Sequence, residues 1–180
     1  LAALDRAAEL GVDTGELHFG RAVLLYDAGA LEAAAAAFMR AAEGLTGDDR
    51  CSARSNAAMV LRTLGRGDEC LAAHRRNVEE CPASHAAWYG LGLAEVKLGA
   101  YDRCVASITR ALELDPADGN AHYTIACAYA LRRGDGDDGR ALEHVAAAIA
   151  AEPELRAAIA DDDDFADLAD DPRFRELIDG

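Results

Sequence analysis

Residues 85–118, HAAWYGLGLAEVKLGAYDRCVASITRALELDPAD, contain two apolar-periodic segments joined by a short turn. In Ala86–Leu98 and again in Tyr101–Leu114, apolar residues recur three or four positions apart, which is the spacing of an amphipathic helix. Gly99 lies between the segments, where glycine commonly supplies the left-handed residue that ends a helix. Pro116 follows the second segment and disfavours its continuation. The stretch therefore predicts a helix hairpin.

Large and small side chains are distributed along this hairpin in a way that lets two helices pack closely. Gly92 and Cys104 are small enough for the helices to approach, while Trp88, Leu91 and Ile108 would fill the space around them. The offsets of these residues resemble those of the tetratricopeptide repeat (TPR). The resemblance implies an all-α fold. That fold is a right-handed superhelix of antiparallel helix hairpins, a TPR-like α-solenoid, with a short C-terminal helical cap.

The same pattern recurs along the chain and divides it into six segments. Residues 51–84 align with the central hairpin without a gap, and equal length is typical of a repeat. Because Leu1–Leu10 already forms a helical stripe, we expect the sequence to start inside a longer protein. The predicted segments are the second helix of a truncated upstream repeat (1–14), a first repeat (15–50), a second (51–84), a third (85–118), a fourth with a loop insertion (119–153) and an acidic C-terminal capping segment (154–180).

The last two segments carry distinctive acidic stretches. The insertion RRGDGDDGR, residues 132–140, is rich in glycine and aspartate, so we expect an exposed loop there. It lacks the spacing and the terminal glutamate of a calcium-binding loop, and we predict no metal site. In the capping segment, Asp161–Asp164 and Asp171 are expected at the N-termini of short helices, where carboxylates suit the helix dipole.

Composition and charge limit the classes of function. With 51% hydrophobic and 6% aromatic residues the chain is predicted to fold, and it has no apolar run long enough to span a membrane. The net charge is −15, and residues 135–180 hold 15 acidic and four basic residues. This charge argues against nucleic acid as a partner and favours a neutral or basic protein.

The cysteines show neither a CxxC pair nor a histidine at metal-ligand spacing. Cys70 and Cys104 occupy the small-residue position of a second helix, where a buried thiol can replace alanine. We therefore expect no disulfide, and reduced thiols in the cytoplasm or another reducing compartment. The five cysteines are Cys51, Cys70, Cys81, Cys104 and Cys127.

Catalytic motifs are missing from the sequence. It contains no GxSxG nucleophile elbow, no glycine-rich phosphate loop before a lysine and no HExxH zinc motif. His18 and His122 occupy the repeat position of Trp88, which favours a role in helix packing. We predict that the chain is not an enzyme and that it has no cofactor.

The resemblance also implies a binding surface, because the first helix of each repeat lines the inner groove of such a superhelix. The clamp of lysine, asparagine and arginine by which some family members hold a C-terminal carboxylate is matched clearly only by Asn56. The groove positions are instead largely apolar and aromatic, which suits contact with another protein. By position in the repeat, the groove would include Phe19, Val23, Tyr26, Met59, Arg62, Tyr89, Leu93, Lys97 and Tyr123.

These features predict a non-enzymatic protein–protein interaction or scaffold module. Its partner would be an apolar helix or an extended peptide of another protein, with some basic character, and not a nucleic acid or a membrane. One alternative is the regulatory or scaffold end of a larger enzyme. Another is a self-associating structural array, because an unpaired helix at the start would leave an apolar end.

Overall fold

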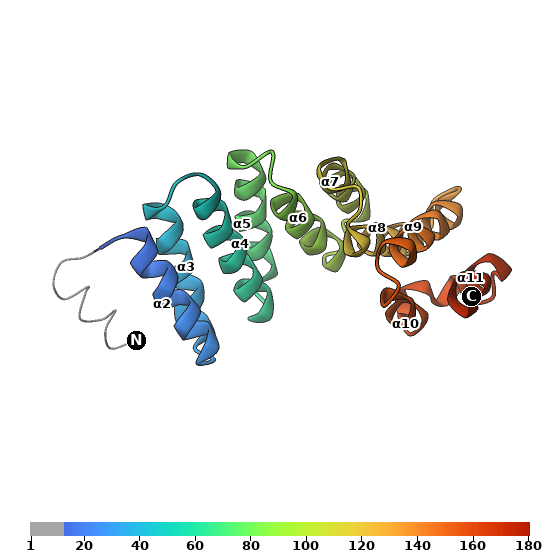
Figure 1. Ribbon diagram of the computed structural model, residues 1–180, viewed down its shortest axis with the longest axis horizontal. Coiled ribbons are helices and arrows are strands. Elements are labelled where there is room, and N and C mark those ends of the chain that lie inside the picture. Colours follow the sequence, from blue (N-terminus) through green and yellow to red (C-terminus); the bar gives the residue numbers. More distant parts are fainter. Residues whose placement is uncertain (1–12) are drawn as a thin grey trace. The chain divides into compact units, whose positions relative to one another are not determined.

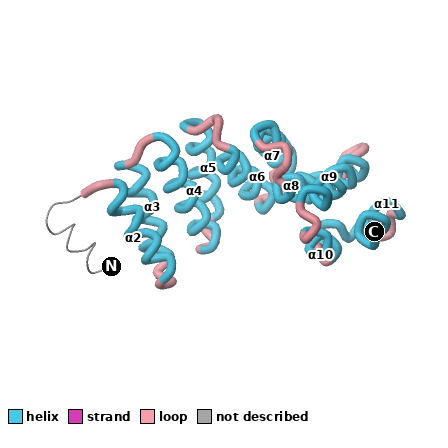
Figure 2. The backbone as a smooth tube through the Cα atoms, in the orientation of Figure 1, coloured by secondary structure: helices cyan, strands magenta, loops and turns pink. Residues whose placement is uncertain are grey.

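The computed structural model describes residues 13–180. Within this range every regular element is a helix, which confirms the all-α prediction (Figure 1, Figure 2). The helix expected over Leu1–Leu10 lies outside the described residues. The chain divides into two compact units, one that ends at Ala87 and one that runs from Trp88 to Gly180. Among residues 13–180, every helix falls short of the length and apolarity that a membrane span requires.

The first unit consists of two helix hairpins whose helices pack consecutively, each on the next. Thr14 caps the first helix, because its side-chain oxygen accepts a hydrogen bond from the Leu17 amide at 3.3 Å. Gly29 and Gly65 have φ angles of 74° and 72° in the two turns, a region that glycine enters without strain. The helices are α2 (Gly15–Asp27), α3 (Leu31–Gly44), α4 (Gly47–Thr63) and α5 (Gly67–Glu80).

Helix α4 begins earlier than the sequence predicted. Residues 47–50, which the repeat pattern assigned to the end of the first repeat, form its first turn. Asp48 and Asp49 lie in this turn, where their carboxylates suit the positive end of the helix dipole. The first predicted repeat, 15–50, is two residues longer than the second, 51–84, and the two extra residues, Asp49 and Arg50, belong to this helix.

The core of the first unit is made largely of alanine. Ala34, Ala41 and Ala53 are fully buried, and their small size lets neighbouring helices approach. Phe38 fills the remaining space with only 3% of its surface exposed. The ring of Phe19 on α2 packs edge-on against it, with the ring centroids 5.4 Å apart.

Two polar side chains are buried between α4 and α5. Asn77 is fully buried, and its Nδ2 donates to the Cys51 carbonyl at 3.1 Å and to Ser55 Oγ at 2.8 Å. His74 is 7% exposed, and its Nδ1 has no hydrogen-bond partner. Burial, helped by the charge of Arg62, lowers the pKa of His74 to about 4. The folded state therefore holds this ring neutral.

Acid should consequently weaken the fold through His74. Because the pKa is about 4 in the folded state and 6.5 without burial, the unfolded state takes up more protons as the pH falls from 6.5 towards 4. We expect the free energy of unfolding to be about 2 kcal/mol lower at pH 5 than at pH 7 through this residue. Urea titrations of the parent and of His74→Leu at both pH values check this. Equal losses in the two proteins would show that His74 is not responsible.

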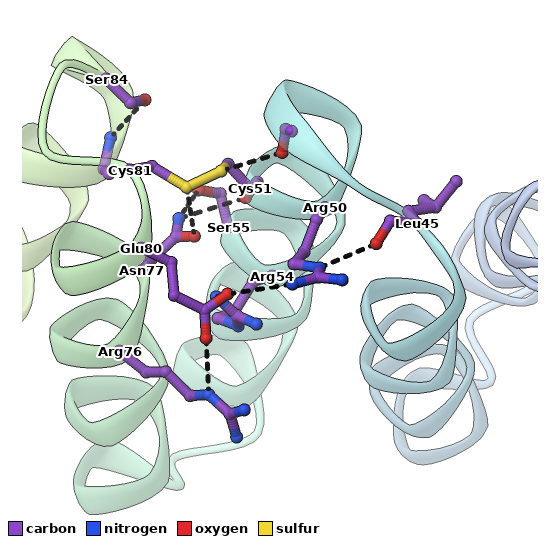
Figure 3. Close-up of a disulfide and its surroundings, with 12 residues drawn as sticks. Leu45, Arg50, Cys51, Arg54, Ser55, Arg76, Asn77, Glu80, Cys81 and Ser84 are labelled. Atoms are coloured by element: carbon purple, nitrogen blue, oxygen red, sulfur yellow. Dashed lines mark hydrogen bonds and ion pairs between the residues drawn. A yellow bond between two sulfur atoms is a disulfide. The ribbon is translucent and has the colours of Figure 1, made fainter.

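The expectation that all five cysteines are reduced was wrong. Cys51 on α4 and Cys81, the residue after α5, form a disulfide (Figure 3). The two residues are 30 positions apart in sequence, but the packing of α4 on α5 brings their Cα atoms to 6.5 Å, within disulfide range. The remaining cysteines are free and buried. Because disulfides persist mainly in oxidising environments, the cysteines no longer support a reducing compartment.

The second unit contains the central hairpin, a further hairpin and three short helices. A Cβ added at Gly92 would overlap the Ile108 side chain, so the small residue is required for this helix approach. Leu91 and Ile108 are buried, as predicted, whereas Trp88 is partly exposed. The helices are α6 (His85–Lys97), which enters this unit from Trp88 onward, α7 (Tyr101–Leu114), α8 (Gly119–Arg132), α9 (Asp137–Ala151), α10 (Leu155–Ala160), the 3₁₀ helix η1 (Asp163–Leu168) and α11 (Pro172–Asp179).

The insertion before α9 is not wholly exposed, so the sequence prediction was wrong for Asp137. This residue is fully buried as the first residue of α9. Its carboxylate accepts hydrogen bonds from Arg132 Nε at 2.8 Å and from Arg140 Nη1 at 3.0 Å. The Gly134 amide also donates to it, at 2.8 Å. These donors, Arg132 first, hold the pKa of Asp137 well below its usual range.

The C-terminal segment covers the core of α8 and α9, as expected of a cap. Phe165 and Phe174 are buried there, with ring centroids 5.7 Å apart. The predicted N-terminal positions are confirmed for two aspartates. Asp162 accepts from the Asp164 amide at the start of η1, and Asp171 accepts from the Arg173 amide at the start of α11.

Candidate functional site

Two hollows lie along the first half of α4 and share Ser52. The smaller is about 300 Å³ and lies between α2 and α4. The larger is about 710 Å³ and lies between α4 and the segment that follows α5. The smaller is lined by Glu16, Phe19, Gly20, Leu45, Asp49 and Ser52. The larger is lined by Asp48, Cys51, Ser52, Ser55, Asn56, Glu80, Cys81, Pro82, Ala83, Ser84 and Ala86.

The two hollows differ in chemistry. Phe19 and Leu45 line the smaller one, so its floor can accept an apolar side chain. The larger hollow presents hydroxyl and amide groups from Ser55 and Asn56 beside the disulfide. Such groups can hydrogen-bond the backbone or polar side chains of a bound segment. A chain that crossed both hollows would meet an apolar site next to a polar one.

Exposed apolar side chains continue the same helix faces. Val23 and Tyr26 follow Phe19 by four and seven positions on α2, and they are 38% and 39% exposed. On α4, Met59 and Arg62 follow Ser52 and Ser55 at helical spacing, and Met59 is 37% exposed. The surface called the α2–α4 face below comprises Phe19, Val23, Tyr26, Ser52, Ser55, Met59 and Arg62.

The remaining predicted groove residues lie in the second unit. Tyr89 is partly buried against the apolar core of α7 and α8, and Leu93 is also partly buried. Lys97 is exposed. Tyr123 lies under the C-terminal cap, where its hydroxyl donates to Asp162 Oδ2 and its ring stacks on Phe165 at a centroid distance of 6.1 Å. Burial and this hydrogen bond raise the pKa of Tyr123 above its usual value.

A cluster of ligand-type side chains beside Tyr123 was missed by the sequence analysis. Cys127, Asp162 and Asp164 each offer one atom, and these atoms lie within 4.8 Å of one another. Asp162 is already occupied, because it accepts from Tyr123 and from the Asp164 amide. Burial raises the pKa of the Cys127 thiol, which disfavours the thiolate that a metal requires. The cluster is best explained as the hydrogen-bonded attachment of the cap to α8.

The histidines of the second unit serve packing, as predicted for His122. Its Nδ1 lies 2.9 Å from Nδ1 of His144, and its Nε2 lies 3.2 Å from the Pro116 carbonyl. The His144 ring stacks on Tyr129, with centroids 5.8 Å apart. Burial and the neighbouring His122 lower the pKa of His144. The pair joins α8 to α9 and has no nucleophile among these partners.

Part of the sequence matches a known protein family, and the fold matches solved structures. Residues 85–118 match the tetratricopeptide repeat family. No curated protein matches the sequence significantly. Solved structures of similar fold include YrrB, described as a TPR protein with an unusual peptide-binding site. It is 22% identical, with a TM-score of 0.73, over 88% of this chain and 79% of its own.

Two further structures agree in fold. MamA from Desulfovibrio magneticus RS-1 is 18% identical, with a TM-score of 0.71, over 93% of this chain and 94% of its own. A thermophilic TPR protein of Thermus thermophilus, TTC0263, is 20% identical, with a TM-score of 0.69, over 91% of this chain and 88% of its own. Residues 85–118 thus match one tetratricopeptide repeat, and the chain shares the helix-hairpin fold of these structures.

Proposed function

We propose that this chain is a non-enzymatic protein-interaction module whose α2–α4 face binds an apolar helix or an extended segment of another protein. The observation that carries the proposal is the pair of adjoining hollows on α4, together with the exposed side chains of Val23, Tyr26 and Met59 farther along the same helix faces. Exposed apolar side chains gathered around hollows are typical of protein interfaces. The peptide-binding site of YrrB, a protein of the same fold, supports the same class of function.

The lining predicts the character of the bound segment. An apolar side chain would enter the smaller hollow beside Phe19, and Tyr26 would add rigid contact area with a hydroxyl group. Met59 offers a flexible apolar surface that can adapt to different segments. Acidic side chains at the hollows, among them Glu16, Asp48 and Asp49, favour a partner that also carries basic residues.

The test uses peptides selected from a displayed random library against the full chain. For a selected peptide, we expect the double variant Tyr26→Ala, Met59→Ala to weaken binding by about 2 kcal/mol, roughly 30-fold in the dissociation constant. The matched control is Met39→Ala on α3, because Met39 and Met59 are equally exposed at 37%. Fluorescence anisotropy gives the dissociation constants, and circular dichroism confirms that each variant is folded.

Two results would contradict the proposal. One is that the double variant binds the selected peptides as tightly as the parent. The other is that Met39→Ala weakens binding as much as the double variant, because Met39 lies outside the α2–α4 face.

A further inference from the structure

On the side of α4 that faces away from the α2–α4 face, three arginine side chains surround the carboxylate of Glu80. Arg76 Nε donates to Glu80 Oε1 at 3.0 Å. Arg54 Nη1 and Arg50 Nη1 lie 3.0 and 3.7 Å from the other oxygen, Oε2 (Figure 3). The guanidiniums of Arg76 and Arg54 hold the pKa of Glu80 below its usual range. Glu80 is therefore ionised near neutral pH and offsets one of three positive charges.

Arg54 is the buried member of this group. Its side chain is only 5% exposed, and Nη1 forms an ion pair with Glu80 but no hydrogen bond. A buried guanidinium is costly unless its charge and its N–H groups are both satisfied. A single carboxylate shared with two other arginines leaves donors to spare, because each guanidinium has five N–H bonds.

A pocket of about 270 Å³ adjoins this group of arginines. Arg50, Arg54 and Arg76 line one part of it, and Met39 and Ala42 of α3 provide an apolar part. Glu43 also lines it, so the three arginines and two glutamates around the pocket leave one positive charge in a chain whose net charge is −15. The name arginine pocket is used below for Met39, Ala42, Glu43, Arg50, Arg54 and Arg76.

We propose that the arginine pocket is an anion site that takes a phosphate monoester. Guanidinium groups bind phosphate oxygens through paired, charge-assisted hydrogen bonds. A monoester supplies three acceptor oxygens and close to two negative charges, which matches several donors better than a second carboxylate does. The organic group of the ester would lie against Met39 and Ala42.

This site is separate from the α2–α4 face. Along α4, Arg50 and Arg54 lie on the side of the helix opposite Ser52 and Met59, because residues advance by about 100° each. The inference goes beyond the proposed peptide binding and can fail or succeed without it.

The chain offers one reporter for each site, since its only two methionines are Met39 and Met59. Phenyl phosphate is titrated into the full chain carrying ¹³C-methyl methionine, at constant ionic strength, and followed by NMR. We expect a saturable shift of the Met39 methyl resonance and none of Met59. Inorganic phosphate should bind more weakly, because it lacks the apolar group, and benzoate should bind more weakly because it lacks the third oxygen and the second charge.

Matched variants connect the shift to the arginines. Arg76→Gln removes a side chain that is 67% exposed, so the fold should persist, and we expect at least a tenfold loss of affinity for phenyl phosphate. Arg75→Gln, the adjacent exposed arginine on α5, should stay within twofold of the parent. Arg50→Gln, on α4, should independently lower the affinity for phenyl phosphate.

Each other outcome overturns the proposal in a defined way. Absence of a saturable Met39 shift, or equal losses in Arg76→Gln and Arg75→Gln, would mean that no anion site exists here. Equal affinity for benzoate would make the pocket a carboxylate site, and equal affinity for inorganic phosphate would exclude a monoester as the preferred ligand.

Discussion

Replacing Phe165 by alanine is expected to lower the free energy of unfolding by about 3–5 kcal/mol. Phe165 is 1% exposed and lies between Tyr123 of α8 and Phe174 of α11, at centroid distances of 6.1 and 5.7 Å. Removing its ring would leave a cavity where the cap meets the core of α8 and α9. Because a stack of repeats needs its last helix pair covered, the loss should spread to these helices.

Urea titration followed by circular dichroism measures this effect. The control is Glu176→Ala on α11, an exposed position in the same cap, which should change the stability by less than about 0.5 kcal/mol. A loss below about 1 kcal/mol in Phe165→Ala would mean that the cap does not stabilise the second unit.

Opening the disulfide between Cys51 and Cys81 should have the second large effect. The bond closes a loop with a sequence separation of 30, and restriction of the unfolded chain by such a loop is worth about 3–4 kcal/mol. The double variant Cys51→Ala, Cys81→Ala should therefore unfold at a clearly lower urea concentration than the oxidised parent. Dithiothreitol should lower the parent towards the variant and leave the variant unchanged.

Alkylation gives an independent check of the same pairing. In the unfolded, unreduced parent, a thiol reagent should modify three of the five cysteines, Cys70, Cys104 and Cys127. Modification of all five, together with a parent that is insensitive to dithiothreitol, would contradict the disulfide.

The helices and their close approaches could be predicted from the sequence because their signals are local. The apolar spacing in residues 85–118 and the glycine at 99 each act within a few residues, and Gly99 has the expected positive φ of 70°. The prediction that Gly92 must be small to accommodate its neighbours also holds, since a side chain there would overlap Ile108. A repeat pattern predicts such contacts because the same contacts recur in each hairpin.

The features that the sequence did not predict are contacts between pairs of residues whose pairing is not part of the repeat pattern. Cys51 lies near the start of α4 and Cys81 follows the end of α5, and these two ends of the hairpin lie side by side. Nothing in the sequence near either cysteine indicates that the other is its partner. Asp137 was expected in solvent because glycine and aspartate surround it, but Arg132 and Arg140 bury its charge. Their positions five residues before and three after it were the available signal.

The candidate site was predicted only in outline. Helical periodicity predicts Phe19, Val23 and Tyr26 on one face of α2. It could not show the hollows, which depend on how α4 packs against α2 and against the segment that follows α5. Nor could it show that Tyr123 lies beneath the cap, because its partner Asp162 is 39 residues away in sequence.

The most direct test of the α2–α4 face as the binding surface is NMR of the two methionine methyl groups during titration with a selected peptide. Met59 lies on the α2–α4 face, and Met39 lies on α3 at the arginine pocket. The proposed function predicts that the Met59 resonance shifts in proportion to peptide bound while Met39 stays in place. A shift of Met39 alone, with Met59 unchanged at saturation, would contradict it.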